Sequence, residues 1–187
     1  MPFKALLIAC FASLAFPAAA LEYAIDPEHT YASFEIDHLG FSTQRGQFTR
    51  SSGTLDFDPE AHSGKVYIRI AAASLTTGLE ARDEVLRGAD WFNVRDFPDL
   101  LFRSQRFVFK EDKLVAVEGT LVMLGVIKPL RLEISRFKCG LNLASRKQVC
   151  GADAQGSLRR SEFGLSNGLP FVGDEVRLHI QVEAHLP

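Results

Sequence analysis

The chain of 187 residues carries 21 Lys and Arg against 23 Asp and Glu, which gives a formal net charge of −2. Such a mild and evenly spread charge argues against binding to nucleic-acid phosphates, which requires a basic face. No low-complexity linker, block of like charges or internal repeat divides the sequence. We therefore expect one domain with a substantial core and no nucleic-acid partner.

Residues 1–20 have the layout of a secretory signal peptide. A positive start, MPFK, precedes an apolar run of twelve residues and a small-residue end, with cleavage expected before Leu21. The run is shorter than the roughly 20 apolar residues that span a bilayer. Alternatively, Leu7–Cys10 resembles a lipoprotein box, which would leave Cys10 lipidated. We predict a signal peptide over residues 1–20, export to the periplasm and a mature domain over residues 21–187.

Alternating apolar and polar residues predict that most of the mature domain is β-structure. The pattern is cleanest in VRLHIQVEAH, Val176–His185, where every second residue is apolar, as in a half-buried antiparallel strand. Turn-like sequences such as KEDK, GVIKP, SNGLP and VGD separate the runs. Eight strands at this spacing predict a mainly β fold, either a sandwich or a closed barrel. We expect them within residues 32–38, 46–57, 66–70, 100–109, 114–124, 130–134, 151–163 and 176–185.

One short helix interrupts the strands near the middle of the chain. Thr77, followed three residues later by Glu80, matches a capping box and predicts that the helix starts there. Gly88 or Pro98 can end the segment. Three rings follow the helix directly, and they either close the mouth of a barrel or belong to its core: Trp91, Phe92 and Phe97.

Two cysteines remain beyond residue 20, Cys139 and Cys150. In an oxidising compartment such a pair is expected to form a disulfide, and closing the short loop between them would contribute about 3 kcal/mol. The competing interpretation is a redox-active or metal-binding pair. It lacks the tight C-x-x-C spacing and any nearby histidine.

Four stretches of the sequence carry a resemblance to a known family. They are YAIDPEHTYASFEIDHLGFSTQRGQF, SLTTGLEARDEVLRGADWFNVRDFPDLLFRS, GTLVMLGVIKPLRL and GSLRRSEFGL. Together they resemble the YceI-like family of exported lipid-binding proteins, from Tyr23 to about Glu183. The resemblance implies an eight-stranded antiparallel lipocalin-like barrel with one short helix near its mouth. It also implies a cavity for a polyisoprenoid or another long-chain amphiphile.

Three positions depart from the pattern of the family. Val85 stands where relatives often carry His, and Val122 and Ile127 stand where they often carry Thr. Each aliphatic side chain replaces a group that can form hydrogen bonds. The polar contacts to the ligand are therefore the part of the site expected to differ most.

The residues expected at the ligand site are mainly aromatic, because a hollow barrel needs an apolar inner face. His38 shares a strand face with Phe34 and Ile36, and its ring either contacts the ligand or is satisfied by a backbone carbonyl. We expect the cavity to be lined or closed by Phe34, His38, Phe41, Phe48, Leu86, Trp91, Phe92, Phe97, Phe102 and Phe163. The candidate contacts to a polar head group are His38, Arg82, Arg87 and Arg160, with Arg159 as a further candidate. The arginines are included because guanidinium groups match phosphate geometry.

The sequence offers no support for catalysis. It contains no G-x-S-x-G elbow, phosphate-cradling glycine loop or dinucleotide fingerprint, and its five histidines show no i, i+4 pair or cysteine partner for a metal. We predict a non-enzymatic binder with no cofactor other than a bound polyisoprenoid or quinone. One alternative is an accessory protein that presents a quinone to a membrane cytochrome, with transient contact to the membrane. Another is a stress-response protein whose barrel is filled by its own side chains.

Overall fold

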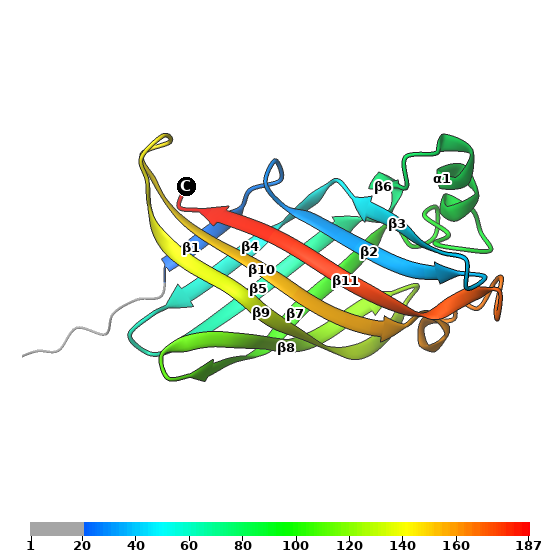
Figure 1. Ribbon diagram of the computed structural model, residues 1–187. Helices are drawn as coiled ribbons and strands as arrows, with labels where there is room; N and C mark the ends of the chain where they lie inside the picture. Colours follow the sequence, from blue (N-terminus) through cyan, green and yellow to red (C-terminus); the bar gives the residue numbers. More distant parts are fainter. Residues whose placement is uncertain (1–20) are drawn as a thin grey trace, which may run out of the picture.

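The computed structural model describes residues 21–187, so the predicted signal peptide and Cys10 lie outside the described part. Most of this part is β-structure, with one α-helix (Figure 1). No helix within it is long and apolar enough to cross a membrane. The elements are β1 Leu21–Ile25, β2 Tyr31–His38, β3 Ser42–Phe48, β4 Ser51–Asp58, β5 Ser63–Ala71, β6 Leu75–Thr76, α1 Glu80–Arg87, β7 Asp99–Lys110, β8 Lys113–Met123, β9 Val126–Asn142, β10 Lys147–Arg159 and β11 Val172–His185, with short 3-10 turns at Ala72–Ser74 and Arg160–Phe163.

These strands form one closed antiparallel barrel of eight barrel strands. Three barrel strands each consist of two segments in line, namely β1 with β2, β3 with β4, and β5 with β6, because β1 pairs with β4, β2 with β3, and β3 with β6. Every barrel strand pairs with its neighbour in sequence. The last strand, β11, closes the ring by pairing with both segments of the first barrel strand. It pairs with β2 over most of its length, and with β1 where Ala24 lies opposite His185 and Ile25 opposite Ala184. The expected eight-stranded barrel is confirmed, and a sandwich is excluded.

Because the strands alternate in direction, the barrel has two distinct ends. We call one the helix end; it holds the β2–β3 turn, α1 with residues 88–98, the β8–β9 turn and residues 160–171. We call the other the terminal end; it holds Leu21, the C-terminus and the β9–β10 hairpin. Figure 1 shows the helix end on the right and the terminal end on the left.

Several predicted boundaries are wrong. The strand expected over residues 46–57 is interrupted after Phe48, because the N–H of Thr49 donates to the Ser74 carbonyl outside the regular strand pairing. The segment GVIKP is mostly strand, because the turn consists only of Leu124 and Gly125, both with positive φ as a tight hairpin requires. The VGD segment lies inside β11, at a bulge. The strand expected to reach Phe163 ends at Arg159.

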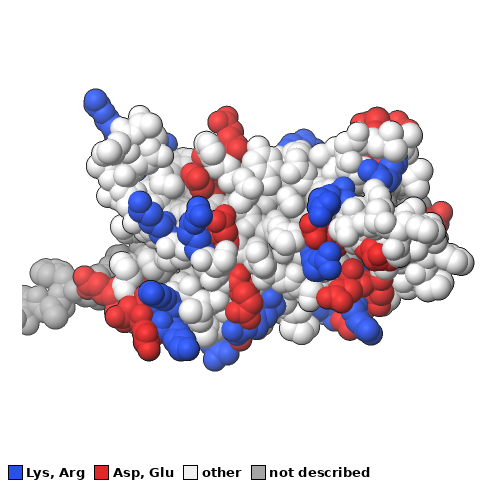
Figure 2. Space-filling view, viewed as in Figure 1, with Lys and Arg blue, Asp and Glu red and all other residues white. Residues whose placement is uncertain are grey.

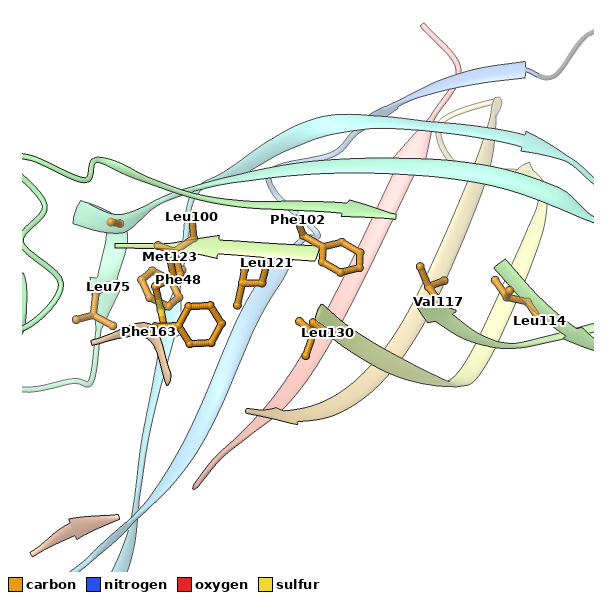
Figure 3. Close-up of a cluster of buried hydrophobic side chains, with 11 residues drawn as sticks. Phe48, Leu75, Leu100, Phe102, Leu114, Val117, Leu121, Met123, Leu130 and Phe163 are labelled. Carbon is orange, nitrogen blue, oxygen red and sulfur yellow. The ribbon is translucent and has the colours of Figure 1, made fainter. Parts of the chain in front are cut away.

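The buried side chains form two clusters inside the barrel. Figure 3 shows the larger one, in which Phe48, Leu75 and Phe163 draw together at the helix end while Leu114 lies toward the other end. The smaller cluster occupies the terminal end and includes Tyr23, Ile25, Leu55, Phe57, Cys150 and Ala184. Side chains such as Ile68 and Phe107 pack against both clusters, so the two clusters together form one apolar interior along the barrel.

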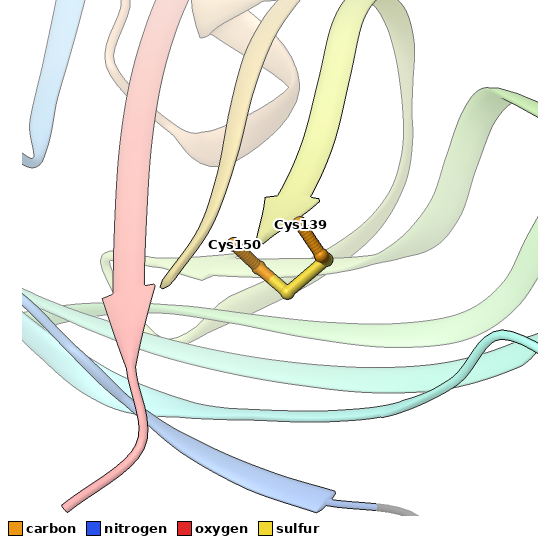
Figure 4. Close-up of a disulfide and its surroundings, with 2 residues drawn as sticks. All are labelled: Cys139 and Cys150. Carbon is orange, nitrogen blue, oxygen red and sulfur yellow. A yellow bond between two sulfur atoms is a disulfide. The ribbon is translucent and has the colours of Figure 1, made fainter. Parts of the chain in front are cut away.

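A disulfide joins Cys139 and Cys150, with an S–S distance of 2.03 Å. Figure 4 shows the two cysteines bridging β9 and β10, where they lie directly opposite each other in the register. The predicted disulfide is confirmed. It ties together the hairpin that extends the barrel at the terminal end.

Candidate ligand-binding site

A cavity of about 460 Å³ lies inside the barrel. Its size falls within the range of roughly 300–1,000 Å³ typical of small-molecule sites. The cavity argues against the stress-response hypothesis, which requires a barrel filled by its own side chains. Seven of the ten side chains predicted from the sequence lie on the cavity wall: Phe34, His38, Phe48, Leu86, Trp91, Phe92 and Phe102.

Three predicted aromatic residues lie elsewhere. Phe41 is 89% exposed, because the strand alternation ends at His38 and the following turn directs the ring outward. Phe97 packs over the β8–β9 turn, where a Cβ atom at Gly125 would lie 3.1 Å from its ring. Phe163 is buried in the larger core cluster, since the chain leaves β10 in a 3-10 turn before reaching it. The prediction that these rings line the cavity is wrong.

Aromatic rings build the cavity wall next to α1. The rings of Phe34 and Phe48 lie 6.0 Å apart, and Phe92 meets Phe48 edge-on at 5.5 Å. Gly46 lies opposite Phe34 in the β2–β3 register, and a Cβ atom there would lie only 2.5 Å from the Phe34 ring. The glycine thus makes room for Phe34 to cover β3, and the ring supplies the apolar surface that the glycine lacks.

The cavity reaches the surface beside α1, at an opening that we call the mouth. Val85 lines the cavity and is nevertheless 59% exposed. Four polar side chains also line the cavity at this end: His38, Gln44, Thr77 and Arg82. The wall elsewhere is predominantly aliphatic and aromatic. A ligand with a polar group at one end of an apolar body fits this arrangement.

Arg82 lies at the centre of the polar mouth. Its guanidinium donates to Gln44 Oε1 at 2.7 Å, to Thr77 Oγ1 at 2.7 Å and to the Thr77 carbonyl at 3.0 Å. Each terminal nitrogen keeps one N–H without an acceptor among residues 21–187. The ring nitrogens of His38 likewise have no partner within the described chain. Arg82 and His38 thus line the mouth, where the sequence predicts contacts to a polar head group, whereas Gln44 and Thr77 were missed.

A buried carboxylate, Asp83, holds α1 on the barrel. The predicted capping box is wrong: the helix begins at Glu80 after Leu79, and no side chain in the described structure caps it. Thr77 instead donates its hydroxyl and its N–H to Asp83 Oδ1, at 2.5 and 2.8 Å. Burial of Asp83, which is 1% exposed, acts to raise its pKa, but the hydrogen bonds from Thr77 and Thr76 and the charge of Arg87 together outweigh burial and hold the pKa below its ordinary value.

Asp83→Asn is expected to lower the free energy of unfolding by about 2 kcal/mol at neutral pH, because the hydrogen bonds to a charged acceptor are weakened. The depressed pKa contributes stability above the unfolded value of about 3.9, and this contribution is lost as the pH falls through the folded pKa. The difference between the two proteins should therefore shrink in acid. Urea unfolding at neutral and acidic pH measures it, with exposed Glu84→Gln as the control. Equal stability of Asp83→Asn and the parent at neutral pH would contradict this role.

Two of the predicted head-group arginines are structural instead. Arg160 is 1% exposed and donates to the backbone carbonyls of four residues at 2.6–2.9 Å: Leu165, Asn167, Val172 and Gly173. Burial lowers its pKa, against the opposing charge of Asp174. Arg87 donates to the Leu75 carbonyl and to Glu80, which braces α1 against β6. The further candidate, Arg159, lies on the exposed face of β10.

A buried hydroxyl that the sequence argument missed faces the cavity. Ser51 begins β4, just after the interruption that was not predicted, and its side chain lines the cavity. Its Oγ is buried and has no hydrogen-bond partner among the described residues. Because an unsatisfied buried polar group is costly, this hydroxyl is available to a ligand oxygen deep in the barrel.

Ser51→Ala is expected to raise the free energy of unfolding of the ligand-free protein by about 1 kcal/mol, since it removes an unsatisfied buried group. Urea unfolding measures this change, and Ser52→Ala on the exposed outer face of the same strand is the control. The same variant should bind an oxygen-bearing ligand more weakly if that oxygen reaches Ser51. A clear loss of stability in the ligand-free variant would show that the hydroxyl is already satisfied.

Away from the cavity, Asp26, His29 and Glu183 bring their side-chain ligand atoms within 4.8 Å of one another. The Nδ1 atom of His29 lies 2.8 Å from Asp26 Oδ2, and this hydrogen bond raises the pKa of His29. No i, i+4 histidine pair or cysteine marks this group in the sequence, and its Asp26–His29 contact has i, i+3 spacing. The group lies at the terminal end on the outside of the barrel, so it is separate from the ligand site.

Comparison with known proteins agrees with this architecture. Residues 23–184 match the model of the YceI-like domain. The chain is 37% identical over 186 residues to Protein YceI of Salmonella agona, with 96% of each chain covered. Similar solved structures include Burkholderia cenocepacia BcnA (TM-score 0.72, 21% identity, 86% of this chain and 99% of that one). Another is a Campylobacter jejuni YceI protein (TM-score 0.67, 29% identity, 80% and 89%). A third is a polyisoprenoid binding domain from Saccharophagus degradans (TM-score 0.65, 16% identity, 91% and 100%). The chain thus belongs to the YceI-like family.

Proposed function

We propose that this protein binds a long-chain isoprenoid lipid or a quinone-like amphiphile in its barrel and stores or carries it in the periplasm, without catalysing a reaction. The observation that carries the proposal is the cavity of about 460 Å³, apolar along most of its wall and polar at its mouth. The signal-peptide pattern of residues 1–20 supports export. The similarity in fold to a polyisoprenoid binding domain supports this class of ligand.

Burial of the ligand tail supplies the binding energy. Each methylene group transferred from water contributes roughly 0.8 kcal/mol, from which the costs of ordering the ligand are subtracted. The tail lies among the side chains of the barrel interior, such as Phe102 and Leu121, and the polar group lies against Arg82 or His38. Affinity then depends mainly on tail length, and the mouth selects the head group.

The experiment that tests this function is direct identification of the ligand. The exported protein is purified without detergent and extracted with organic solvent, and the extract is examined by mass spectrometry. An isoprenoid or quinone at about one molecule per protein is the expected result. An empty extract, repeated after incubation with membrane lipids, would overturn the proposal.

A further inference from the structure

Large apolar side chains are exposed at the helix end. We call five of them the apolar rim: Leu39, Phe41, Leu79, Val85 and Phe171. Phe41 is 89% exposed and Phe171 65%, which is unusual for phenylalanine in a protein with a packed core. The rim residues come from the β2–β3 turn, the start and middle of α1, and the segment before β11. Exposed apolar side chains gathered in one region mark an interaction surface.

Two segments of the rim are held side by side. The N–H of Leu39 donates to the carbonyl of Phe171 at 2.8 Å, which joins the β2–β3 turn to the segment before β11. Figure 1 shows both segments at the extreme right-hand tip of the molecule, and Figure 2 shows mostly uncharged surface at that tip. The rings therefore project from turns at the end of the barrel.

The apolar rim is continuous with the mouth of the cavity. Val85 belongs to both, and the residues next to two other rim positions, His38 and Val172, line the cavity. An apolar molecule that enters the mouth from this side passes from the rim directly to the cavity wall, beside the polar side chains of Arg82 and His38.

The charges beside the β2–β3 turn are largely paired. Arg45 forms an ion pair with Glu35 at 2.8 Å, and Glu35 also accepts from Arg177 at 3.1 Å. The carboxylate of Asp37 accepts the N–H of Gly40 at 3.0 Å. No strong charge of one sign accompanies the exposed rings in these contacts. Attraction to a charged partner is therefore a small part of what the β2–β3 turn offers.

We propose that the apolar rim docks the protein onto a lipid bilayer, with the rings of Phe41 and Phe171 inserted at the boundary of head groups and acyl chains. Separate rings on projecting turns suit a fluid bilayer better than a flat protein interface, and the cavity mouth beside them then faces the membrane. The inference rests on the proposed function, because it assumes that the ligand is a membrane amphiphile. Since apolar contact dominates, docking depends little on ionic strength.

The test is partition of the purified protein onto phosphatidylcholine vesicles, measured by flotation. Phe41→Ser combined with Phe171→Ser is expected to weaken partition by about tenfold or more. The matched control is Leu141→Ser with Leu143→Ser at the terminal end, where Leu143 is 84% exposed; it should partition like the parent. The docking proposal is overturned if the parent does not partition, or if both double variants lose it equally.

A second measurement separates docking from ligand binding. A fluorescent long-chain amphiphile added from solvent should bind the Phe41/Phe171 double variant as tightly as the parent, because these rings lie outside the cavity. Its transfer from vesicles to that variant should be about tenfold slower or more, in proportion to the lost partition. Vesicle partition without amphiphile binding would contradict the proposed function but not the docking proposal. A different result is that the parent is a dimer, the Phe41/Phe171 double variant is a monomer, and the parent does not partition onto vesicles. The rim then contacts a second copy, and the bilayer proposal is wrong.

Discussion

Arg160→Met is expected to lower the free energy of unfolding by about 4 kcal/mol or more. The substitution keeps much of the apolar stem but removes the donors to four backbone carbonyls. Each buried acceptor left without a partner costs roughly 1–3 kcal/mol. The guanidinium also lies 5.6 Å from the centre of the Trp91 ring, so the cavity wall near the mouth loses a support.

Urea unfolding measures this loss, and Arg159→Met is the matched control. Arg159 is the preceding residue and lies exposed on β10, so its replacement should change the free energy of unfolding by less than about 0.5 kcal/mol. If Arg160→Met does not fold, the milder Arg160→Lys should fold with part of the loss, because an ammonium reaches fewer of the carbonyls. Arg160→Met within about 1 kcal/mol of the parent would refute the role given to these hydrogen bonds.

Ala154→Trp is expected to reduce ligand binding by about a hundredfold or more, because the indole occupies space that the tail would fill. Ala154 is buried on β10 and lines the cavity between Ile134 and Ile180 of the neighbouring strands. Overpacking a dense core costs about 1–3 kcal/mol. Because Ala154 faces a cavity, its replacement should lower the free energy of unfolding by about 1 kcal/mol or less. The expected result is a folded protein that does not hold lipid.

The lipid retained per protein molecule, measured by mass spectrometry, and urea unfolding together test this variant. Gln155→Trp adds the same ring to the outer face of the same strand and should leave retention unchanged. Undiminished retention in Ala154→Trp, with the fold intact, would place the ligand outside the barrel.

The barrel was predictable because its strands obey a local rule. Alternation with a period of two identified Val176–His185 and most other strands, since one face of each is buried and the other meets water. What alternation cannot decide is closure. The choice between a sandwich and a barrel depends on the pairing of β11 with β1 and β2, which no local pattern encodes.

The candidate site was predictable only in part, because it depends on contacts that are distant in sequence or unusual in type. Phe34 and Phe48 follow the strand phase and reach the cavity, whereas Phe41 stands in a turn where the phase no longer applies. Arg160 was expected to hold an anion, but its acceptors are backbone carbonyls, which carry no signature in side-chain type. Thr77 donates to the side chain of Asp83 within α1, whereas the expected cap would have accepted a backbone N–H of the first turn.

The pairing of β11 with β1 and β2 also determines the order in which the barrel can assemble. Every other pair of barrel strands is adjacent in sequence and can form as a hairpin, but Ala24 meets His185 only after nearly the whole chain has been ordered. Loop-closure entropy makes such distant pairing slow, and until it forms two strand edges stay open to other chains. The period before closure is thus when the protein is most exposed to aggregation. Since the cavity needs a complete wall, ligand can be retained only once the last strand is in place.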